Sequence, residues 1–588
     1  LDNSAARPVN GYADWEDALL KKGHQQDYSL SVSGGNEKSN FIGTLGYTNQ
    51  TGISINSGME RFTGRIDANS KWNKFEYGMN ATFSWTRNKH TPEGQYYASA
   101  LYSSKYQLTP SIPIYNEDGS YHTGFQNNGG INPLYENSVD SNYARLARTM
   151  ASAKAAYHIL DGLKLSTIFT VDYSLNKDFF FYSPDGKDGE ATQGSGQMMM
   201  IERMSYTSQT NLAYNKTFGK HNINAVLAYE VMKYDYEDMY GEKQVYGQTL
   251  NPSLDNGAKP ADLTNTRQED AMVSYVGSLN YGYNDKYYAG FSFRRDGSSR
   301  LAPDTRWGNF WAVSASWRLS QENFMKNLTF INDLKLRASV GTTGTQNLTS
   351  FSNRDLYEAT SYNNLSAIIH KQVGNRDIRW EKSTQYDLGL DFALFDYRLT
   401  GSISGYIKDT KDLIWSFDFP PSATGGSMQM NRNIGALTNR GIEINLVGRV
   451  LSTKDWSLDL TLNMSHNKNK VTRLVEEGKA QSAMDVVVQG SYADQVLAVG
   501  YPMGAFHGYE YAGIIQDQAR IDELNAYAKS KGQSYYDGNS LKPGHLEIKD
   551  LNGDGIINYN DRVIIGNPDP DLFGGLTANL SYKQFSLF

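Results

Sequence analysis

The chain has 588 residues, of which 39% are hydrophobic and 20% are charged, and it contains no cysteine. The absence of cysteine excludes disulfides, thiolate nucleophiles and cysteine-ligated zinc sites. Its 56 basic and 63 acidic residues give a net charge of −7, which disfavours nucleic acid as a partner, because nucleic-acid-binding proteins concentrate positive charge.

The first predicted element is a helix of about two turns from Asp14 to Lys22. No later segment approaches the roughly 18 consecutive apolar residues that a membrane-spanning helix needs. A membrane-spanning β-barrel is still compatible with this sequence, because its strands alternate lipid-facing and lumen-facing residues, so that the average hydropathy stays low.

Strict alternation of apolar and polar residues then dominates the chain. From Phe75 to Trp85 every second residue is apolar, and the pattern recurs in segments 163–173, 311–319, 442–450 and 456–464. These runs of about 9–11 residues have the length that a tilted strand needs to cross a bilayer, whereas soluble strands average five or six. An ordinary β-sandwich or propeller also alternates, but the length of the runs and the lack of a fixed repeat favour the membrane barrel.

The connections between the predicted strands are of two kinds. Short polar turns, several with flanking aromatic residues, are predicted at 37–39, 72–75, 161–162, 218–221, 283–287, 332–333, 395–397, 454–456 and 582–585. Long connections are predicted at 90–143, 186–197, 237–266 and 481–562. Hairpins at these short turns predict roughly 16–18 strands. Short turns on one side and long loops on the other are typical of outer-membrane barrels.

The longest connection, 481–562, is predicted to be an extracellular loop region with a short helix and a calcium-loop-like motif. Asp517 is a candidate N-cap for a helix that runs to Lys531, and Gly532 provides a stop signal. The apolar residues at helical spacing are Ile521, Leu524 and Ala528.

The calcium-loop-like motif has the spacing D-x-N-x-D-G-x-I-x-x-x-D. Ligand positions 1, 3, 5, 7, 9 and 12 of such a loop fall on Asp550, Asn552, Asp554, Ile556 (through its backbone carbonyl), Asn558 and Asp561. Hard oxygen ligands suit Ca²⁺ in a structural role. The flanking segments 545–549 and 563–565 resemble strands rather than EF-hand helices, and an Asx-rich turn without metal explains the same residues.

Enzymatic motifs are not found in the sequence. The nine histidines are dispersed without an H-E-x-x-H pair, and neither a G-x-S-x-G elbow nor a phosphate-binding G-x-x-x-x-G-K-[ST] loop is present. We therefore expect no enzyme activity and assign no catalytic residues.

A series of motifs in fixed order covers nearly the whole chain. They occupy residues 14–15, 28–35, 46–53, 294–300, 306–308, 336–341, 343–347, 380–385, 433–435, 439–443, 550–556 and 565–571. Together they resemble the SusC-like (RagA-type) TonB-dependent transporters of the Gram-negative outer membrane.

The resemblance implies an all-β fold, a transmembrane antiparallel β-barrel of about 22 strands in a complete member of the family. Residues 1–588 would form a partial barrel domain that crosses the outer membrane many times. The N-terminal plug, the TonB-binding segment and the last strands of the family are not recognisable in the sequence, so we expect an internal fragment of the barrel.

The resemblance also implies active, TonB-dependent import of oligomeric nutrients, either glycans or peptides. The expected partners are a SusD-like surface lipoprotein that acts as a lid, the TonB complex reached through the missing N-terminal region, an oligosaccharide or oligopeptide ligand, and outer-membrane lipid. No substrate-binding residue can be assigned from the sequence. The alternative is a passive barrel, or a surface binding or adhesin protein without energy coupling.

Overall fold

The computed structural model describes residues 12–91, 97–247, 251–363, 365–419, 422, 428–474, 486–489, 494–536 and 541–587. It divides into two compact units: unit 1 comprises residues 1–214 and 226–275, and unit 2 comprises residues 215–225 and 276–588. Eighteen strands of the described residues belong to the large antiparallel sheet, as expected from the predicted 16–18. Every helix in these residues is too short or too polar to cross a membrane.

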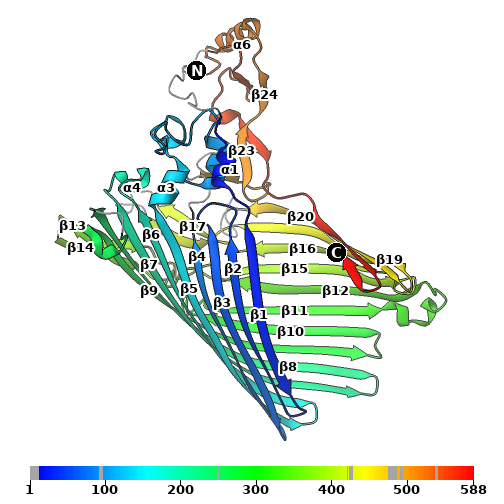
Figure 1. Ribbon diagram of the computed structural model, residues 1–588. Coiled ribbons are helices and arrows are strands. Elements are labelled where there is room, and N and C mark those ends of the chain that lie inside the picture. The colour runs from blue at the N-terminus through cyan, green and yellow to red at the C-terminus, as the bar shows by residue number, and fades with distance from the viewer. Residues whose placement is uncertain are drawn as a thin grey trace. The chain divides into compact units, whose positions relative to one another are not determined.

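Unit 1 contains the first strands of the sheet (Figure 1), and by residue number one end of each of the last three is assigned to unit 2. The strands are β1 (His24–Gly35), β2 (Ser39–Thr51), β3 (Gly58–Trp72), β4 (Phe75–Lys89), β5 (Ser141–Leu160), β6 (Leu163–Tyr182), β7 (Ser195–Phe218), β8 (His221–Tyr246) and β9 (Gly257–Tyr283). Its helices are α1 (Trp15–Leu19), α2 (Ala100–Tyr102), α3 (Pro133–Val139) and α4 (Lys187–Glu190).

Unit 2 contains the remaining strands of the large sheet and several small sheets. The large-sheet strands are β10 (Tyr287–Ser298), β11 (Trp307–Arg318), β12 (Ile331–Thr345), β15 (Glu381–Leu394), β16 (Leu399–Lys411), β19 (Ala436–Ser452), β20 (Trp456–Arg473), β27 (Phe573–Tyr582) and β28 (Phe585–Leu587). The small sheets pair β13 (Leu356–Tyr362) with β14 (Leu365–Gln372), β17 (Ile414–Phe419) with β18 (Met428–Asn433), β24 (Tyr511–Ile514) with β25 (Leu546–Ile548), and β21 (Val486–Gln489) with β22 (Asp494–Leu497), β23 (Ala505–Tyr509) and β26 (Arg562–Gly566).

The two faces of the sheet differ in chemistry, as the alternation predicts. In unit 1 the aromatic residues Tyr28, Tyr47 and Phe62 lie opposite one another on β1, β2 and β3, with neighbouring ring centroids 6.4 and 4.7 Å apart. Two residues further along, on the same face, Leu30 and Leu45 are 64% and 65% exposed. Such an apolar face is stable only against a non-aqueous medium, which supports the prediction that it meets lipid.

The opposite face of the sheet carries polar side chains that bond across strands. In unit 1 the Thr48 hydroxyl donates to Asp27 Oδ1 at 2.7 Å. In unit 2 Arg337 Nε lies 3.1 Å from Asp391 Oδ1 on the neighbouring strand. These strands therefore present one apolar and one polar face, which is the pattern of a barrel with a polar interior.

Two predicted connections are wrong. The segment 237–266 was expected to be a long loop, but β8 and β9 run through most of it. Polar side chains bond across the two strands: Asn265 Nδ2 on β9 donates to Glu237 Oε1 on β8 at 3.1 Å, and just outside the segment Lys233 on β8 lies 3.7 Å from Glu269 on β9. A strand whose two faces both meet water needs no alternation of apolar and polar residues. It still pairs with its neighbour, because the hydrogen bonds between strands join backbone groups.

The turn predicted at 332–333 is the second error. These residues lie inside β12, at an irregularity of the β12–β15 register between Ile331 and Asp333. The Asp333 carboxylate accepts hydrogen bonds from Arg318 Nε and the Ser320 hydroxyl, each at 2.7 Å. Asn332 and Asp333, which suggested a turn, therefore lie in a strand. The two hydrogen bonds of Asp333 hold the preceding connection against that strand. The other short turns lie where they were predicted, between consecutive strands.

The clusters of buried apolar residues lie mostly in the connections and at the strand ends next to them. One joins α1 and α2 and consists of Trp15, Leu19, Ala100, Leu108 and Ile112. Trp15 Nε1 donates to the Ile112 carbonyl at 3.0 Å, so the predicted helix after Asp14, shortened here to Trp15–Leu19, anchors the connection between β4 and β5. The loops of this protein are therefore packed structures with cores of their own.

Candidate metal centre

The predicted calcium loop lies in the connection between β20 and β27, next to a small helical core. Helix α6 (Gln518–Ser530) begins after Asp517, whose Oδ1 accepts the Arg520 N–H at 2.9 Å, and Gly532 follows with a φ of +73°, as predicted. The core consists of Ile515, Ile521, Leu524, Ala528, Tyr535 and Ile557. Strands β25 and β26 flank the loop, which confirms the predicted strand flanks. Residues 481–485, 490–493 and 537–540 of the predicted 481–562 region lie outside the described residues.

Asp550, the first predicted ligand, accepts hydrogen bonds at both carboxylate oxygens. The Gly553 N–H donates to Oδ1 and the Gly555 N–H to Oδ2, each at 2.7 Å. The Tyr527 hydroxyl on α6 donates to Oδ2 at 3.1 Å. Asp550 therefore fixes the turn and ties it to the helix.

The next predicted ligands continue the same turn. Asn552 Oδ1 accepts the Asp554 N–H at 2.9 Å, and Asn552 Nδ2 donates to Asp554 Oδ2 at 2.9 Å. Asp554 Oδ1 accepts the N–H of Ile556, the fourth predicted ligand, at 3.0 Å. Gly555 has a φ of +87°, the left-handed conformation that the predicted sharp turn requires.

Asp561, the last predicted ligand, closes the loop from its far end. It is 0% exposed, and it accepts the Leu551 N–H at Oδ1 and the Asn558 N–H at Oδ2, both at 2.9 Å. The Asn558 side chain in turn accepts the Asn560 N–H at 2.8 Å. All six predicted residues therefore lie in one closed turn.

The charge of Asp550 is stabilised by this arrangement. Burial opposes its ionised form, but the N–H groups of Gly555 and Gly553 and the Tyr527 hydroxyl outweigh burial and hold the pKa of Asp550 below its usual value. The loop offers hard oxygen ligands to a cation, although amide donors already satisfy several of their lone pairs.

A second acidic group was not predicted from the sequence. Glu136, Asp140 and Asp188 form the one set of three or more acidic or histidine side chains, among the described residues, whose ligand atoms all lie within 4.8 Å of one another. Burial raises the pKa of Asp140 to about 7 and also raises that of Glu136. The i,i+4 spacing of Glu136 and Asp140 is visible in the sequence, but nothing in it points to Asp188.

The family model described as "TonB dependent receptor-like, beta-barrel" matches residues 84–563, well over half of the chain. Among curated proteins, the chain is 31% identical to "TonB-dependent receptor P3" of Formosa agariphila, over 100% of this chain and 58% of the relative. It is 28% identical to "TonB-dependent receptor SusC" of Bacteroides thetaiotaomicron, over 97% of this chain and 57% of the relative. The chain thus spans somewhat more than half the length of these relatives.

Among solved structures, the RagAB peptide transporter matches with a TM-score of 0.80 and 21% identity, over 98% of this chain and 62% of that chain. The RagAB peptide importer in its "open-open" state matches with a TM-score of 0.79 and 20% identity, over 99% and 62%. At these identities the likeness establishes the fold alone. It confirms the predicted all-β transmembrane barrel.

Proposed function

Because the chain belongs to the TonB-dependent receptor-like β-barrel family, we propose that it forms most of the barrel of an active importer of oligomeric nutrients, either glycans or peptides. Proteins of this family lie in the outer membrane of Gram-negative bacteria and cross it many times with strands. The motifs in the sequence predict both this family and this location.

The observation that carries the proposal is the likeness to SusC along 97% of the chain. The structure supports it with strands that have one exposed apolar face and one polar face, and with long connections that fold into packed modules. A barrel with such loops can bind a large ligand on the outer side of the membrane before the ligand passes through the lumen.

We further propose a SusD-like lipoprotein as the lid of this barrel and the TonB complex as its source of energy. The support for both is the likeness to SusC and to the RagAB transporter. The TonB complex would act through the N-terminal region that the resemblance implies. Glycan and peptide are two alternative cargoes, and one of the similar solved structures is described as a peptide transporter.

The proposal is tested in the native bacterium with the complete gene. We expect the barrel to co-purify with a surface lipoprotein and with a bound oligomer, which mass spectrometry identifies. Uptake of that labelled oligomer should be lost when TonB is deleted, whereas binding at the cell surface should persist. A passive barrel would take up the oligomer equally well in both strains, and an adhesin would bind without uptake in either.

The 550–561 loop is proposed to bind one Ca²⁺ in a structural role, through Asp550, Asn552, Asp554, the Ile556 carbonyl, Asn558 and Asp561. The support is the ligand spacing and the closed turn in which the structure places these residues. Calcium titration of the full-length protein should show this site in the wild type and its loss in Asp554→Ala. Equal calcium binding by the two proteins contradicts the assignment.

A further inference from the structure

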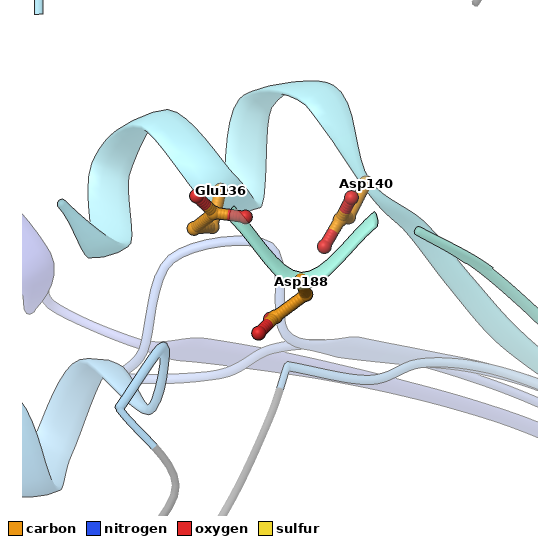
Figure 2. Close-up of side chains that lie close together, drawn as sticks. All are labelled: Glu136, Asp140 and Asp188. Atoms are coloured by element: carbon orange, nitrogen blue, oxygen red, sulfur yellow. The ribbon is translucent and has the colours of Figure 1, made fainter. Parts of the chain in front are cut away.

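The second acidic group lies where two connections of unit 1 meet. Glu136 and Asp140 are one helical turn apart on α3 and at its C-cap, directly before β5, and Asp188 lies in α4, shortly after β6. The start of β5 pairs with the end of β6, with Ser141 opposite Phe181, so the antiparallel register brings α3 and α4 together. Figure 2 shows the three carboxylates gathered beside the end of α3.

Backbone hydrogen bonds hold two of the three carboxylates in place across the two connections. Glu136 Oε1 accepts the Lys187 N–H and Asp140 Oδ1 accepts the Ser183 N–H, each at 2.8 Å. A Cβ added to Gly186 would come within 2.6 Å of Glu136 Oε2, so the chain passes directly over this carboxylate. The arrangement is therefore preformed, because neither connection can move without breaking these contacts.

One oxygen at the centre of this group has no donor. Glu136 is only 2% exposed, and its Oε2 is buried without a hydrogen-bond partner in the described part of the chain. A buried carboxylate oxygen that loses water and gains no donor is strongly unfavourable, so it marks a place where a ligand completes the site.

Nearby basic side chains do not neutralise Glu136 or Asp140. The Lys187 ammonium pairs with Glu190 at the surface instead. Arg87, Lys89 and His90 line the same cavity as Glu136 and Asp140, but no ion pair joins them to Glu136 or Asp140 among the described residues. A bound cation would therefore supply a close positive charge to Glu136 and Asp140, which no ion pair supplies among the described residues.

The three carboxylates are close enough to bind the same Ca²⁺ ion. Two ligands on opposite sides of a Ca²⁺ ion, each at about 2.4 Å, are about 4.8 Å apart, and neighbouring ligands are closer. The three carboxylates lie within 4.8 Å of one another. We propose that Glu136, Asp140 and Asp188 bind one Ca²⁺ ion, which joins the connection that carries α3 to the connection that carries α4.

The substitution Glu136→Gln tests this site directly. The amide keeps the shape of the side chain but removes a charge from a crowded acidic group. We expect the calcium-free variant to fold, with exchange protection of segments 133–140 and 183–190 equal to or greater than that of the wild type. We also expect calcium affinity at this site to fall at least about tenfold, because a charged ligand is lost.

The experiment uses the full-length protein purified in detergent, stripped with EGTA and titrated with Ca²⁺ to about 5 mM, which covers the range of extracellular calcium modules. Calorimetry counts the sites, and hydrogen exchange with mass spectrometry follows the two segments. Asp554→Ala serves as a background that removes the predicted 550–561 site, and Glu190→Gln, in the same connection, is the matched control.

In the Asp554→Ala background, calcium should slow exchange in both segments, and Glu136→Gln should abolish that effect while Glu190→Gln preserves it. The proposal is overturned if calcium leaves exchange in these segments unchanged. It is also overturned if Glu136→Gln binds calcium as the background does, which would indicate that the carboxylates share a proton instead of a metal ion. Either result leaves the proposed transport function untouched, since uptake is not measured.

Discussion

The 550–561 loop in unit 2 and the cluster of Glu136, Asp140 and Asp188 in unit 1 are both rich in carboxylates, but they use them differently. In the loop, both oxygens of Asp550 and Asp561 accept hydrogen bonds from the backbone of the same turn. In the cluster, Glu136 Oε2 is buried and has no such donor in the described residues. The type of ligand atom is therefore not enough to identify a metal site. It matters as much whether hydrogen-bond donors of the protein already occupy that atom.

The two regions are therefore expected to differ in stability when no metal ion is bound. The loop holds its own shape through hydrogen bonds, so a cation adds to a structure that already exists. The cluster brings three carboxylates within 4.8 Å of one another and leaves Glu136 Oε2 without a donor among the described residues, so we expect it to depend on a cation far more strongly. The predictions below test this difference, beginning with the largest effect.

The largest effect is expected for Asp561→Ala. The side chain is fully buried, and its loss leaves the N–H groups of Leu551 and Asn558 without their acceptor. Each orphaned donor costs about 1–3 kcal/mol, so local stability should fall by about 3 kcal/mol. Hydrogen exchange in residues 551–561 should then accelerate about 100-fold, with or without calcium. The exposed neighbour Asn560→Ala should change exchange little, and equal exchange in both variants would show that the loop is not held by Asp561.

Calcium removal should separate the two regions next. With EGTA, exchange in segments 133–140 and 183–190 should accelerate about tenfold or more, because the repulsion among the carboxylates is released. Segment 550–561 should change less, since its backbone donors remain. A larger response in 550–561 than in the cluster would reverse the comparison. Both regions are read in one exchange experiment on the wild-type protein, which makes each the control of the other.

Glu547→Gln should weaken the support of the loop in a pH-dependent way. Arg520 Nη2 on α6 lies 2.6 Å from Glu547 Oε1 on β25, and this bond holds the pKa of Glu547 below its usual value. The folded state therefore binds the proton less readily than the unfolded state, so the pair stabilises above about pH 4.3 and its contribution is lost as the pH falls further. At pH 7 the variant should lose about 1 kcal/mol, discounted for the exposure of Arg520.

The measurement for Glu547→Gln is the exchange protection of α6 at pH 7 and at pH 3.5, corrected for the intrinsic exchange rate. The variant and the wild type should differ more at pH 7 than at pH 3.5. A deficit of the same size at both pH values would mean that the carboxylate charge contributes nothing and that the substitution acts through packing.

The smallest effect is expected for Glu190→Gln. The residue forms a surface ion pair with Lys187 next to the cluster, and its side chain is largely exposed. Solvent and salt screen such pairs, so exchange in segment 183–190 should change less than about twofold. A large change would show that Lys187, freed from Glu190, turns to the acidic cluster and neutralises it.

The sequence by itself determined the strands and helices whose apolar residues recur at the spacing that their packing requires. The alternation from Phe75 to Trp85 corresponds to β4, and the apolar spacing after Asp517 corresponds to α6. The long loop predicted at 237–266 was wrong because β8 and β9 continue there as polar strands without apolar alternation. The predicted calcium-binding residues were found in one turn because a contiguous motif closes on itself.

Only the tertiary structure determined the second acidic site. Glu136 and Asp140 belong to one connection and Asp188 to another, and the pairing of β5 with β6 brings them within reach of one another. Burial of the Glu136 oxygen depends in turn on the passage of Gly186 above it. Neither the register of distant strands nor the loss of water from one atom is encoded in the spacing of residues along the chain, because both arise when the strands assemble.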